Sequence, residues 1–366
     1  MRVIPAYFSY LEGDSYAVGQ EQGEEVKSMV WAKEAWISSN PMGQTRYKEL
    51  AKVMDAYAPG LSEEIQGFAD SLNVEIRALK FFDEAYLKPG GCSLAAVLPS
   101  KASDRKTYVL RNYDLSPEIS DMRLCSTKIT GKYSHSGFSV SCFGRSDGLN
   151  EKGLSVAFAS CGIPVGMHPG MKKPVSAGLQ FMVIVRALLE NCKNVEEGIF
   201  CLKDMPIGAN MNLLLADIKG EAAVVETYDG KMAIARASRE AGYISATNHA
   251  VLPGIEERGV LRQSKVRYDL IHSTLGRSLS VSKQELRDLT LREYPEGITV
   301  HNYKQNFGTV HSVLFDLHAG QLEFSFGSPL ENETYSLKVG ERFPFKELSV
   351  RVPDREYGPE FWAMEE

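Results

Sequence analysis

Cys92 is the residue whose type and position best suit covalent chemistry. It follows Gly90 and Gly91, where a segment with helical patterns gives way to the first strand-like segment. The peptide bond before this thiol is uncrowded, so the sulfur can attack the Gly91 carbonyl, and water can then release a chain that begins at Cys92. The new α-amino group has an ordinary pKa of about 8 and can serve as the base for its own side chain. Taken alone, the boundary also fits an inert cysteine at the start of a strand.

A second candidate nucleophile is Ser146. The segment Gly144-Arg-Ser-Asp-Gly148 matches the GxSxG pattern of serine hydrolases, which presents the serine on a sharp strand-to-helix turn. Here the residues after Gly148 form a turn and then the strand pattern of residues 154–158, so the required helix is missing. We interpret the motif as a hairpin and keep a serine hydrolase that uses Ser146 as an alternative.

Metal and nucleotide motifs do not stand out in the sequence. The seven histidines are dispersed, no HExxH motif or close cysteine cluster occurs, and no P-loop lysine follows the two glycines before Cys92. The six cysteines are scattered without CxxC pairs, which is typical of reduced, buried thiols. We therefore expect neither a metal nor an organic cofactor.

Charge and hydropathy exclude two classes of partner. The formal net charge is -6 and the sequence has no block of lysine or arginine, so we expect no nucleic-acid partner. No apolar run approaches the roughly 18 residues that span a bilayer, and the start of the chain lacks the apolar stretch of a secretion signal. We expect no membrane association and a cytoplasmic protein.

Helical periodicity dominates the first ninety residues. Asp14 or Ser15 is placed to cap a helix that continues to about Trp36, and apolar residues recur at helical spacing over residues 47–57, 61–72 and 74–87. Gly19 and Gly23 lie four residues apart in the first of these segments, which favours close packing of two helices. We expect a helical segment before Cys92.

Strand patterns dominate the rest of the chain. They cover residues 93–98, 107–113, 138–143, 154–160, 212–216, 222–228, 232–237, 243–247, 309–317 and 321–326. Helical patterns occupy residues 178–202, with a break at 191–194, and residues 260–275 and 283–294. Short turns such as Asp229-Gly230 join several strands, which indicates antiparallel pairing. We predict an α+β fold of two mainly antiparallel sheets flanked by helices, in four αββα layers.

Five blocks follow one another along the chain: Gly91-Cys92-Ser93, Leu110-Arg-Asn-Tyr-Asp114, Asp147-Gly-Leu-Asn-Glu-Lys-Gly-Leu154, the segment from Asn212 to Glu226, and Ala246-Thr-Asn-His249. In this order they resemble the choloylglycine hydrolase superfamily of cysteine N-terminal-nucleophile enzymes, which includes the isopenicillin N acyltransferases. The opening Gly13-Asp-Ser-Tyr-Ala-Val-Gly-Gln-Glu-Gln-Gly23 and the late segment from Gly308 to Pro329 look closer to the acyltransferase branch. The resemblance implies the αββα fold, with residues 1–91 as a leader and residues 92–366 as the catalytic domain.

The resemblance also implies roles for individual residues. Arg111 matches a family arginine that favours the thiolate of Cys92, and Asp114 matches an aspartate that holds the α-amino group. Their spacing puts them on opposite faces of an ideal strand, so we expect the strand to bend or end there. A plain salt bridge on a strand is the alternative.

Two more matches lie later in the chain. Asn248 matches an asparagine that donates to the oxyanion, and Arg267 matches an arginine that supports the charge network of the site. A turn asparagine and a surface helix arginine are the simpler interpretations of these two. The family's second asparagine is replaced in the segment Ala157-Phe-Ala-Ser-Cys161, so either Ser160 or a backbone N–H must supply a second oxyanion donor.

We therefore predict an enzyme that cleaves linear amides or thioesters through an acyl-cysteine intermediate on Cys92, after self-cleavage between Gly91 and Cys92. Its partner is a small-molecule acyl amide or acyl thioester, and a homo-oligomer is possible. The sequence does not identify the acyl donor. It also does not show whether water or another nucleophile accepts the acyl group. The alternative from another functional class is a non-catalytic, ligand-binding relative that is never cut after Gly91.

Overall fold

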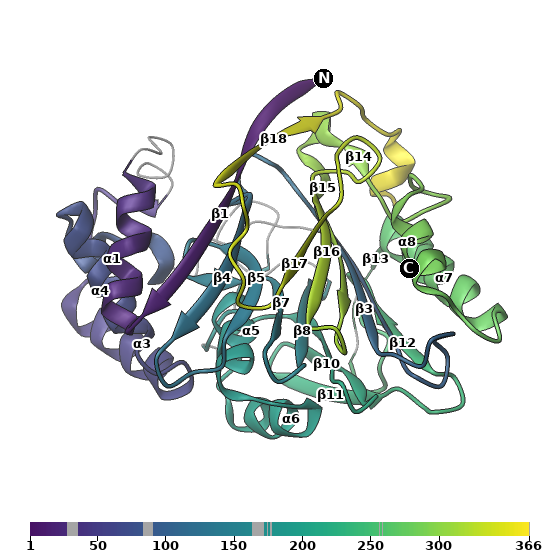
Figure 1. Cartoon of the computed structure of the whole chain (residues 1–366), viewed down its shortest axis with the longest axis horizontal. Helices are drawn as coiled ribbons and strands as arrows, with labels where there is room; N and C mark the ends of the chain where they lie inside the picture. The colour runs from purple at the N-terminus through teal and green to yellow at the C-terminus, as the bar shows by residue number, and fades with distance from the viewer. Residues whose placement is uncertain are drawn as a thin grey trace.

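Two large sheets stack face to face at the centre of the molecule, and helices cover the outer face of each sheet (Figure 1). The computed structural model describes residues 1–27, 36–82, 91–162, 172–173, 175, 178–255, 257 and 259–365. Within those ranges, every helix is too short or too polar to cross a membrane. Gly90 and residues 28–35 and 83–87, which belong to the predicted boundary and helices, lie outside the described residues.

The first sheet is mixed, because one of its strand pairs is parallel and the others are antiparallel. Its order is β11 (Lys231–Arg236), β10 (Ala222–Tyr228), β9 (Met211–Ala216), β8 (Ser155–Ser160), β7 (Asp147–Asn150), β5 (His135–Val140), β4 (Arg123–Ile129), β1 (Arg2–Gly13) and β18 (Glu347–Val352), and β6 (Gly144–Arg145) also pairs with β5. The parallel pair joins β1 to β4. The predicted turn at Asp229-Gly230 joins β10 to β11, and a short turn at Gly220 joins β9 to β10.

The second sheet is antiparallel throughout and carries Cys92. Its order is β12 (Tyr243–Ala246), β2 (Gly91–Val97), β3 (Tyr108–Leu115), β15 (Phe307–Asp316), β16 (Gln321–Phe326) and β17 (Tyr335–Lys338), and β14 (His301–Asn302) also pairs with β15. A separate short pair joins β13 (Val260–Leu261) to β19 (Met364–Glu365). Because β2 lies between β12 and β3, residues from both neighbours can reach the start of β2.

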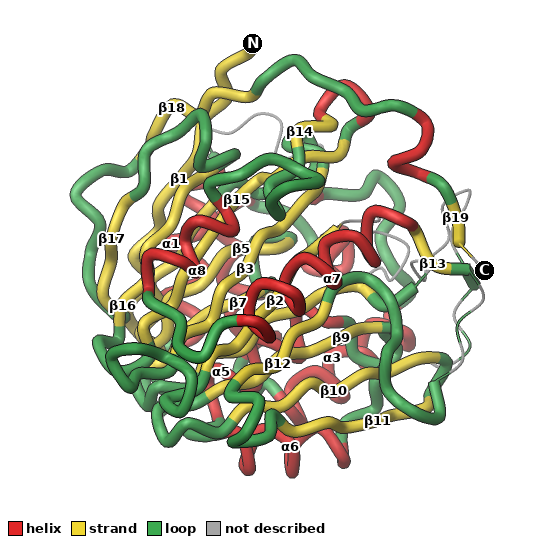
Figure 2. Tube along the Cα trace, turned by 90° about the vertical axis from the view of Figure 1, so that its right-hand side faces the viewer, coloured by secondary structure: helices red, strands yellow, loops and turns green. Residues whose placement is uncertain are grey.

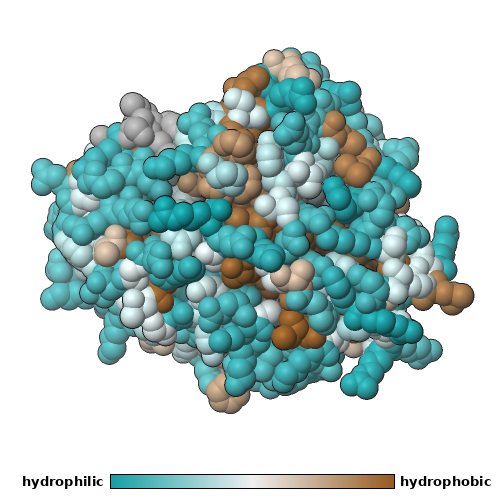
Figure 3. All heavy atoms as spheres, in the orientation of Figure 1, coloured by the Kyte–Doolittle hydropathy of each residue, from teal (hydrophilic) through white to brown (hydrophobic). Residues whose placement is uncertain are grey.

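Three apolar cores separate the four layers. Leu94, Val109, Leu124, Phe138 and Val224 pack together where the two sheets face each other. The outer face of the mixed sheet packs on α3 (Gln44–Tyr57), α4 (Leu61–Leu72), α5 (Phe181–Asn191) and α6 (Val195–Asp204). The outer face of the antiparallel sheet packs on α7 (Arg262–Arg277) and α8 (Lys283–Thr290), which lie across its strands in Figure 2. In Figure 3 hydrophilic residues cover most of the visible face, and apolar residues appear as separate patches.

The two glycines near the start of the chain bring α1 (Ser15–Val26) against α4, as predicted. Asp14 caps α1 by accepting a hydrogen bond from the Ala17 N–H at 2.8 Å. A Cβ atom on Gly19 would lie 1.8 Å from the Glu64 carbonyl oxygen, and one on Gly23 would lie 2.7 Å from Ser71 Cβ. A larger residue at either position would push the two helices apart.

The prediction that the first ninety residues are helical is wrong for residues 2–13. They form β1, which pairs with β4 and β18 and sends Ala6 and Phe8 into the core between the sheets. Pro5 is unfavourable for a strand in the sequence pattern. It pairs only with Ser349 of β18, in the part of β1 that has no partner residue in β4. Proline is tolerated there because its missing N–H costs no ladder bond on the open side. Part of the predicted helix over 74–87 is instead two short 3₁₀ turns, Ile76–Ala78 and Lys80–Phe82.

Candidate active site

Cys92 lies at the start of β2 with its side chain buried between the two sheets. It pairs with Tyr113 of β3, and its backbone N–H donates to Asn248 Oδ1 at 2.7 Å. Burial raises the pKa of the Cys92 thiol to about 11, while the nearby positive charge of Arg111 acts in the opposite direction. In the uncut chain the thiol is therefore protonated at neutral pH, and it requires a base before it can act as a nucleophile.

Arg111 faces the same inter-sheet space as Cys92. Its Nε atom lies 2.5 Å from Asp147 Oδ2 of β7, and its guanidinium lies over the Tyr113 ring at 4.7 Å. Asp147 Oδ2 also lies 2.9 Å from His311 Nε2, and burial lowers the pKa of His311. The positive charge near the thiol is therefore held in place by a buried carboxylate of the mixed sheet.

Asp114 lies on the opposite face of β3, toward α7, as the spacing predicted. The strand does not end at Asp114 but continues to Leu115, and the irregularity lies in β15, whose register shifts between Thr309 and His311. Asp114 Oδ1 accepts from Thr309 Oγ1 at 2.7 Å, and the residue pairs with Gly91 across the ladder. Burial raises the pKa of Asp114 to about 6, although the charge of Arg267 opposes this change.

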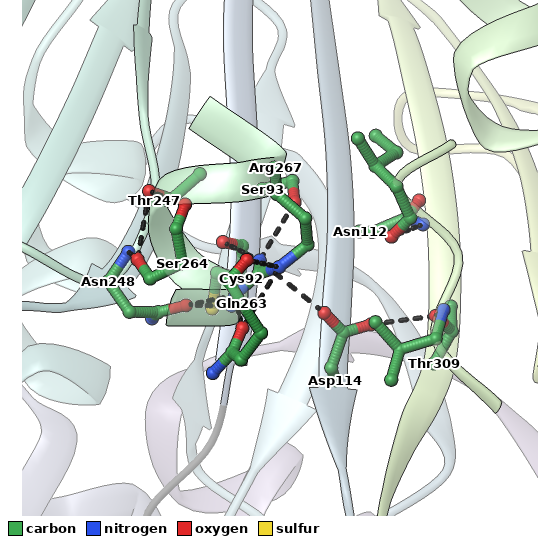
Figure 4. Close-up of polar contacts among 12 residues, drawn as sticks. Cys92, Ser93, Asn112, Asp114, Thr247, Asn248, Gln263, Ser264, Arg267 and Thr309 are labelled. Carbon is green, nitrogen blue, oxygen red and sulfur yellow. Dashed lines mark hydrogen bonds and ion pairs between the residues drawn. The ribbon is translucent and has the colours of Figure 1, made fainter. Parts of the chain in front are cut away.

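Arg267 links Cys92, Asn248 and Asp114 to one another. It projects from α7, and its guanidinium donates to the Cys92 carbonyl oxygen at 2.5 Å and to Asn248 Oδ1 at 3.0 Å (Figure 4). It also donates to Ser93 Oγ at 2.9 Å and lies 3.7 Å from Asp114 Oδ2. The side chain is fully buried, so the interpretation as a surface helix arginine is wrong.

The orientation of the Asn248 side-chain amide follows from its partners. Oδ1 accepts from two donors, the Cys92 N–H and Arg267, so the other end of the amide must be the nitrogen. That nitrogen donates to Ser160 Oγ at 2.9 Å and to the Ser160 carbonyl oxygen at 3.2 Å. An oxyanion that binds Asn248 Nδ2 must therefore lie on the Ser160 side of the amide, close to one of the two predicted candidates for the second donor.

Ser146 lacks the surroundings of a serine nucleophile. It lies between β6 and β7, so a strand and not a helix follows it, as the hairpin interpretation predicted. Its buried hydroxyl donates to Asp147 Oδ2 at 2.9 Å, and His311 contacts that same carboxylate oxygen. A histidine that is to act as base must contact the serine itself.

Asn212 and Glu226 hold the loop that carries Asn248, and the sequence analysis gave neither of them a role. They lie opposite each other on β9 and β10. Asn212 Nδ2 donates to the carbonyl oxygens of Thr247 and His249, both at 2.9 Å. The two Glu226 carboxylate oxygens accept from the N–H groups of Val251 and Leu252, both at 2.9 Å. The available signal was a buried-strand pattern interrupted by one amide or carboxylate side chain near the end of each strand.

We expect Asn212→Ala to lower kcat by about tenfold or more, because a loop displacement of about 1 Å would be enough to misplace Asn248, the predicted oxyanion donor. Asn332→Ala is the matched control, because Asn332 Nδ2 also donates to two backbone carbonyls, those of Ser328 and Arg351. Both changes should lower the free energy of unfolding by about 1–2 kcal/mol. Steady-state kinetics beside thermal unfolding checks this, and equal kcat values for the two variants would contradict it.

Comparison with known proteins gives one family and several structures. The model of the family described as acyl-coenzyme A:6-aminopenicillanic acid acyl-transferase matches residues 100–331, a range that begins after Cys92 and includes Arg111, Asp114, Asn248 and Arg267. A search of curated protein sequences finds no match.

Three solved structures are similar to the chain at low identity. Penicillin V acylase from Agrobacterium tumefaciens is 18% identical, with a TM-score of 0.44 over 68% of this chain and 86% of that one. A mutant of conjugated bile acid hydrolase from Clostridium perfringens is 16% identical, with a TM-score of 0.42 over 72% of this chain and 97% of that one. The N-acylethanolamine-hydrolyzing acid amidase ortholog of Caenorhabditis elegans is 14% identical, with a TM-score of 0.43 over 62% of this chain and 93% of that one.

Proposed function

Because the chain belongs to the acyl-coenzyme A:6-aminopenicillanic acid acyl-transferase family, we propose that it is a cysteine amide hydrolase or acyltransferase of the four-layer N-terminal-nucleophile type. Its nucleophile is Cys92, set free by cleavage after Gly91. The observation that carries this proposal is the contact of Asn248 and Arg267 with the main chain of Cys92, with Asp114 beside them. Burying an arginine and a carboxylate costs free energy, and an inert cysteine at the start of a strand gives no reason to place both of them around its main chain.

Processing begins when the Cys92 thiol gives its proton to a water molecule and the sulfur adds to the Gly91 carbonyl carbon. The bond between that carbon and the Cys92 nitrogen breaks, the nitrogen takes up a proton, and Gly91 is left as a thioester on the sulfur. Water adds to the thioester carbonyl, the carbon–sulfur bond breaks, Gly91 leaves as a carboxylate and the thiol regains a proton. The product chain begins at Cys92 with a free amine, which is the base that the buried thiol requires.

Turnover repeats the same chemistry on a substrate. The sulfur passes its proton to the α-amine and adds to the acyl carbonyl, and Asn248 Nδ2 donates to the oxyanion that forms. The bond to the leaving amine or thiol breaks as that group takes the proton back from the α-ammonium. Water or an acceptor amine then attacks the acyl-cysteine, gives up a proton and frees the sulfur. Asp114 and Arg267 hold the amine and the Cys92 carbonyl in place.

The two products of cleavage, residues 1–91 and 92–366, are proposed to stay together. β1 belongs to the mixed sheet between β4 and β18, so it is bonded on both sides by residues from after the cut. Glu64 of α4 lies 2.9 Å from Arg186 Nη1 of α5, and both side chains are fully buried. Separation would break this buried ion pair and leave Arg186 with only Glu190 as a carboxylate partner, at a cost of several kcal/mol.

Intact-mass measurement and N-terminal sequencing of the purified protein test the proposal directly. We expect two fragments with a junction after Gly91, and hydrolysis of simple acyl amides or acyl thioesters by the processed protein. A stable full-length chain without turnover would instead favour the non-catalytic, ligand-binding relative.

The rate of processing should fall as the pH drops below about 6, where Asp114 of the uncut chain takes up a proton and loses the charge proposed to hold the new amine. The pKa in the folded chain exceeds the ordinary value of 3.8, so between pH 3.8 and about 6 the folded state binds more protons than the unfolded state. Stability from this group therefore rises as the pH falls, so protonation of Asp114 does not itself unfold the chain. Rates of fragment appearance at several pH values check this, and an Asp114→Asn chain should lack the acid limb.

A further inference from the structure

Ser264 lies in the first turn of α7, and its hydroxyl contacts three consecutive residues of the loop that carries Asn248. The Asn248 main-chain N–H donates to Ser264 Oγ at 2.8 Å (Figure 4). Ser264 Oγ also lies 3.0 Å from Thr247 Oγ1 and 2.8 Å from His249 Nδ1. The serine is fully buried, so these contacts take the place of hydrogen bonds to water.

The hydrogens of this cluster can be assigned from its hydrogen-bond network. Thr247 donates its single hydroxyl hydrogen to the Ser264 carbonyl oxygen, 3.0 Å away, so Thr247 Oγ1 is the acceptor for Ser264 Oγ. With its own hydrogen used, Ser264 Oγ accepts from both the Asn248 N–H and His249 Nδ1. Burial lowers the pKa of His249 to about 4, so the ring is uncharged at neutral pH and carries its one hydrogen on Nδ1.

Asn248 is therefore held by α7 at two points. Ser264 binds its main-chain N–H, and Arg267, three residues later on the same face of the helix, binds its Oδ1 at 3.0 Å. On the other side, the Asn248 carbonyl oxygen accepts from the Gly162 N–H at 3.1 Å. Because both the backbone and the side chain are fixed, the direction of Asn248 Nδ2 is set before a substrate binds.

We propose that Ser264 is a positioning residue for the oxyanion donor, because its hydroxyl fixes the main chain of Asn248 on α7. This inference rests on the proposed function and adds to it a residue that acts through Asn248. Arg267 does not supply the same restraint, since it binds the side chain of Asn248 and not its backbone.

The first test compares alanine variants of two buried serines. Ser264→Ala should lower kcat per processed chain by about tenfold or more with KM unchanged, because the lost restraint serves a bond made only in the transition state. Ser328→Ala is the matched control. Ser328 is also fully buried, its Oγ lies 2.6 Å from His301 Nε2, and it accepts from the Leu330 N–H at 3.2 Å. Both variants should lose similar thermal stability, but only Ser264→Ala should lose kcat.

Equal kcat values for the two variants, or a loss in Ser264→Ala that appears in KM alone, would overturn the proposal and leave the acyl-transfer function intact. Absence of turnover in processed wild-type protein would instead show that the proposed function is wrong, and the inference would fall with it.

The second test needs no activity. Long-range ¹H–¹⁵N NMR spectra distinguish the two neutral tautomers of a histidine ring, and the His249 signals are identified by their absence from a His249→Gln protein. We expect the Nδ1–H tautomer of His249 in the wild type and in Ser328→Ala, and a changed Nδ1 signal in Ser264→Ala. The Nε2–H tautomer in the wild type, or an Nδ1 signal that Ser264→Ala leaves unchanged, would show that Ser264 does not bond the loop in this way and would overturn the proposal.

Discussion

A Cys92→Ala protein is expected to remain a single uncut chain of 40.6 kDa and to release no product from any acyl amide or acyl thioester. Alanine removes the sulfur that attacks the Gly91 carbonyl in processing and the acyl carbonyl in turnover, and none of the site residues described above replaces it. Removal of a covalent nucleophile from a preorganised site costs up to about 10⁶-fold in kcat. Intact-mass analysis measures the first effect and a product assay the second.

Cys201→Ala is the control for this change. Cys201 is a partly exposed free thiol on α6, far in sequence from β2, so its removal should leave both processing and turnover at wild-type rates. Normal turnover by the Cys92→Ala protein would remove the cysteine from the mechanism. Loss on Ser146→Ala together with normal turnover by Cys92→Ala would favour the serine hydrolase.

Arg267→Gln should lower the free energy of unfolding by about 3–5 kcal/mol and should also abolish most of the activity. The guanidinium is fully buried and lies beside Asp114, so its loss leaves a buried carboxylate without its partner. It also removes the donors to the Cys92 carbonyl and to Asn248 Oδ1, which fix the nucleophile and the proposed oxyanion donor relative to each other. Chemical denaturation measures the stability, and single-turnover kinetics measures the chemistry.

Arg277→Gln is the matched control at the other end of the same helix, where the arginine is exposed. An exposed charge contributes little to stability, so this variant should match the wild type within about 0.5 kcal/mol. If Arg267→Gln were as stable and active as Arg277→Gln, the buried network around Cys92 would have no role in either property.

Local pattern predicted most elements of the fold. Gln321–Phe326 and Ala222–Tyr228 have the predicted bounds, because each is a short run rich in apolar residues between turn glycines. β1 was missed because its partners are β4 and β18, far away in the sequence, and because Pro5 opposes a strand in local terms. The parallel pairing of β1 with β4 likewise has no local signal, since it depends on which strands meet in space.

The candidate site was likewise predicted only in part from the sequence. The resemblance supplied Arg111, Asp114, Asn248 and Arg267, and the structure brings Asp114, Asn248 and Arg267 around the main chain of Cys92 while Arg111 faces its thiol side of the sheet. Their roles in catalysis stay predictions.

The contacts that hold these residues could not be predicted from the sequence. Asp147 holds Arg111 from the opposite sheet, and Asn212 and Glu226 hold the Asn248 loop across the same boundary. Each contact joins the two sheets, and no periodicity in the sequence specifies how those sheets stack.

The position of β1 sets an order of events for a chain that emerges from a ribosome. β1 is made first, yet one of its two neighbours in the sheet, β18, is made more than three hundred residues later. Asn248 and Arg267 also emerge well after Cys92. A nascent chain that has exposed only the Gly91–Cys92 bond therefore lacks the groups that surround it, so the proposed self-cleavage would have to wait until the chain has been made at least as far as Arg267.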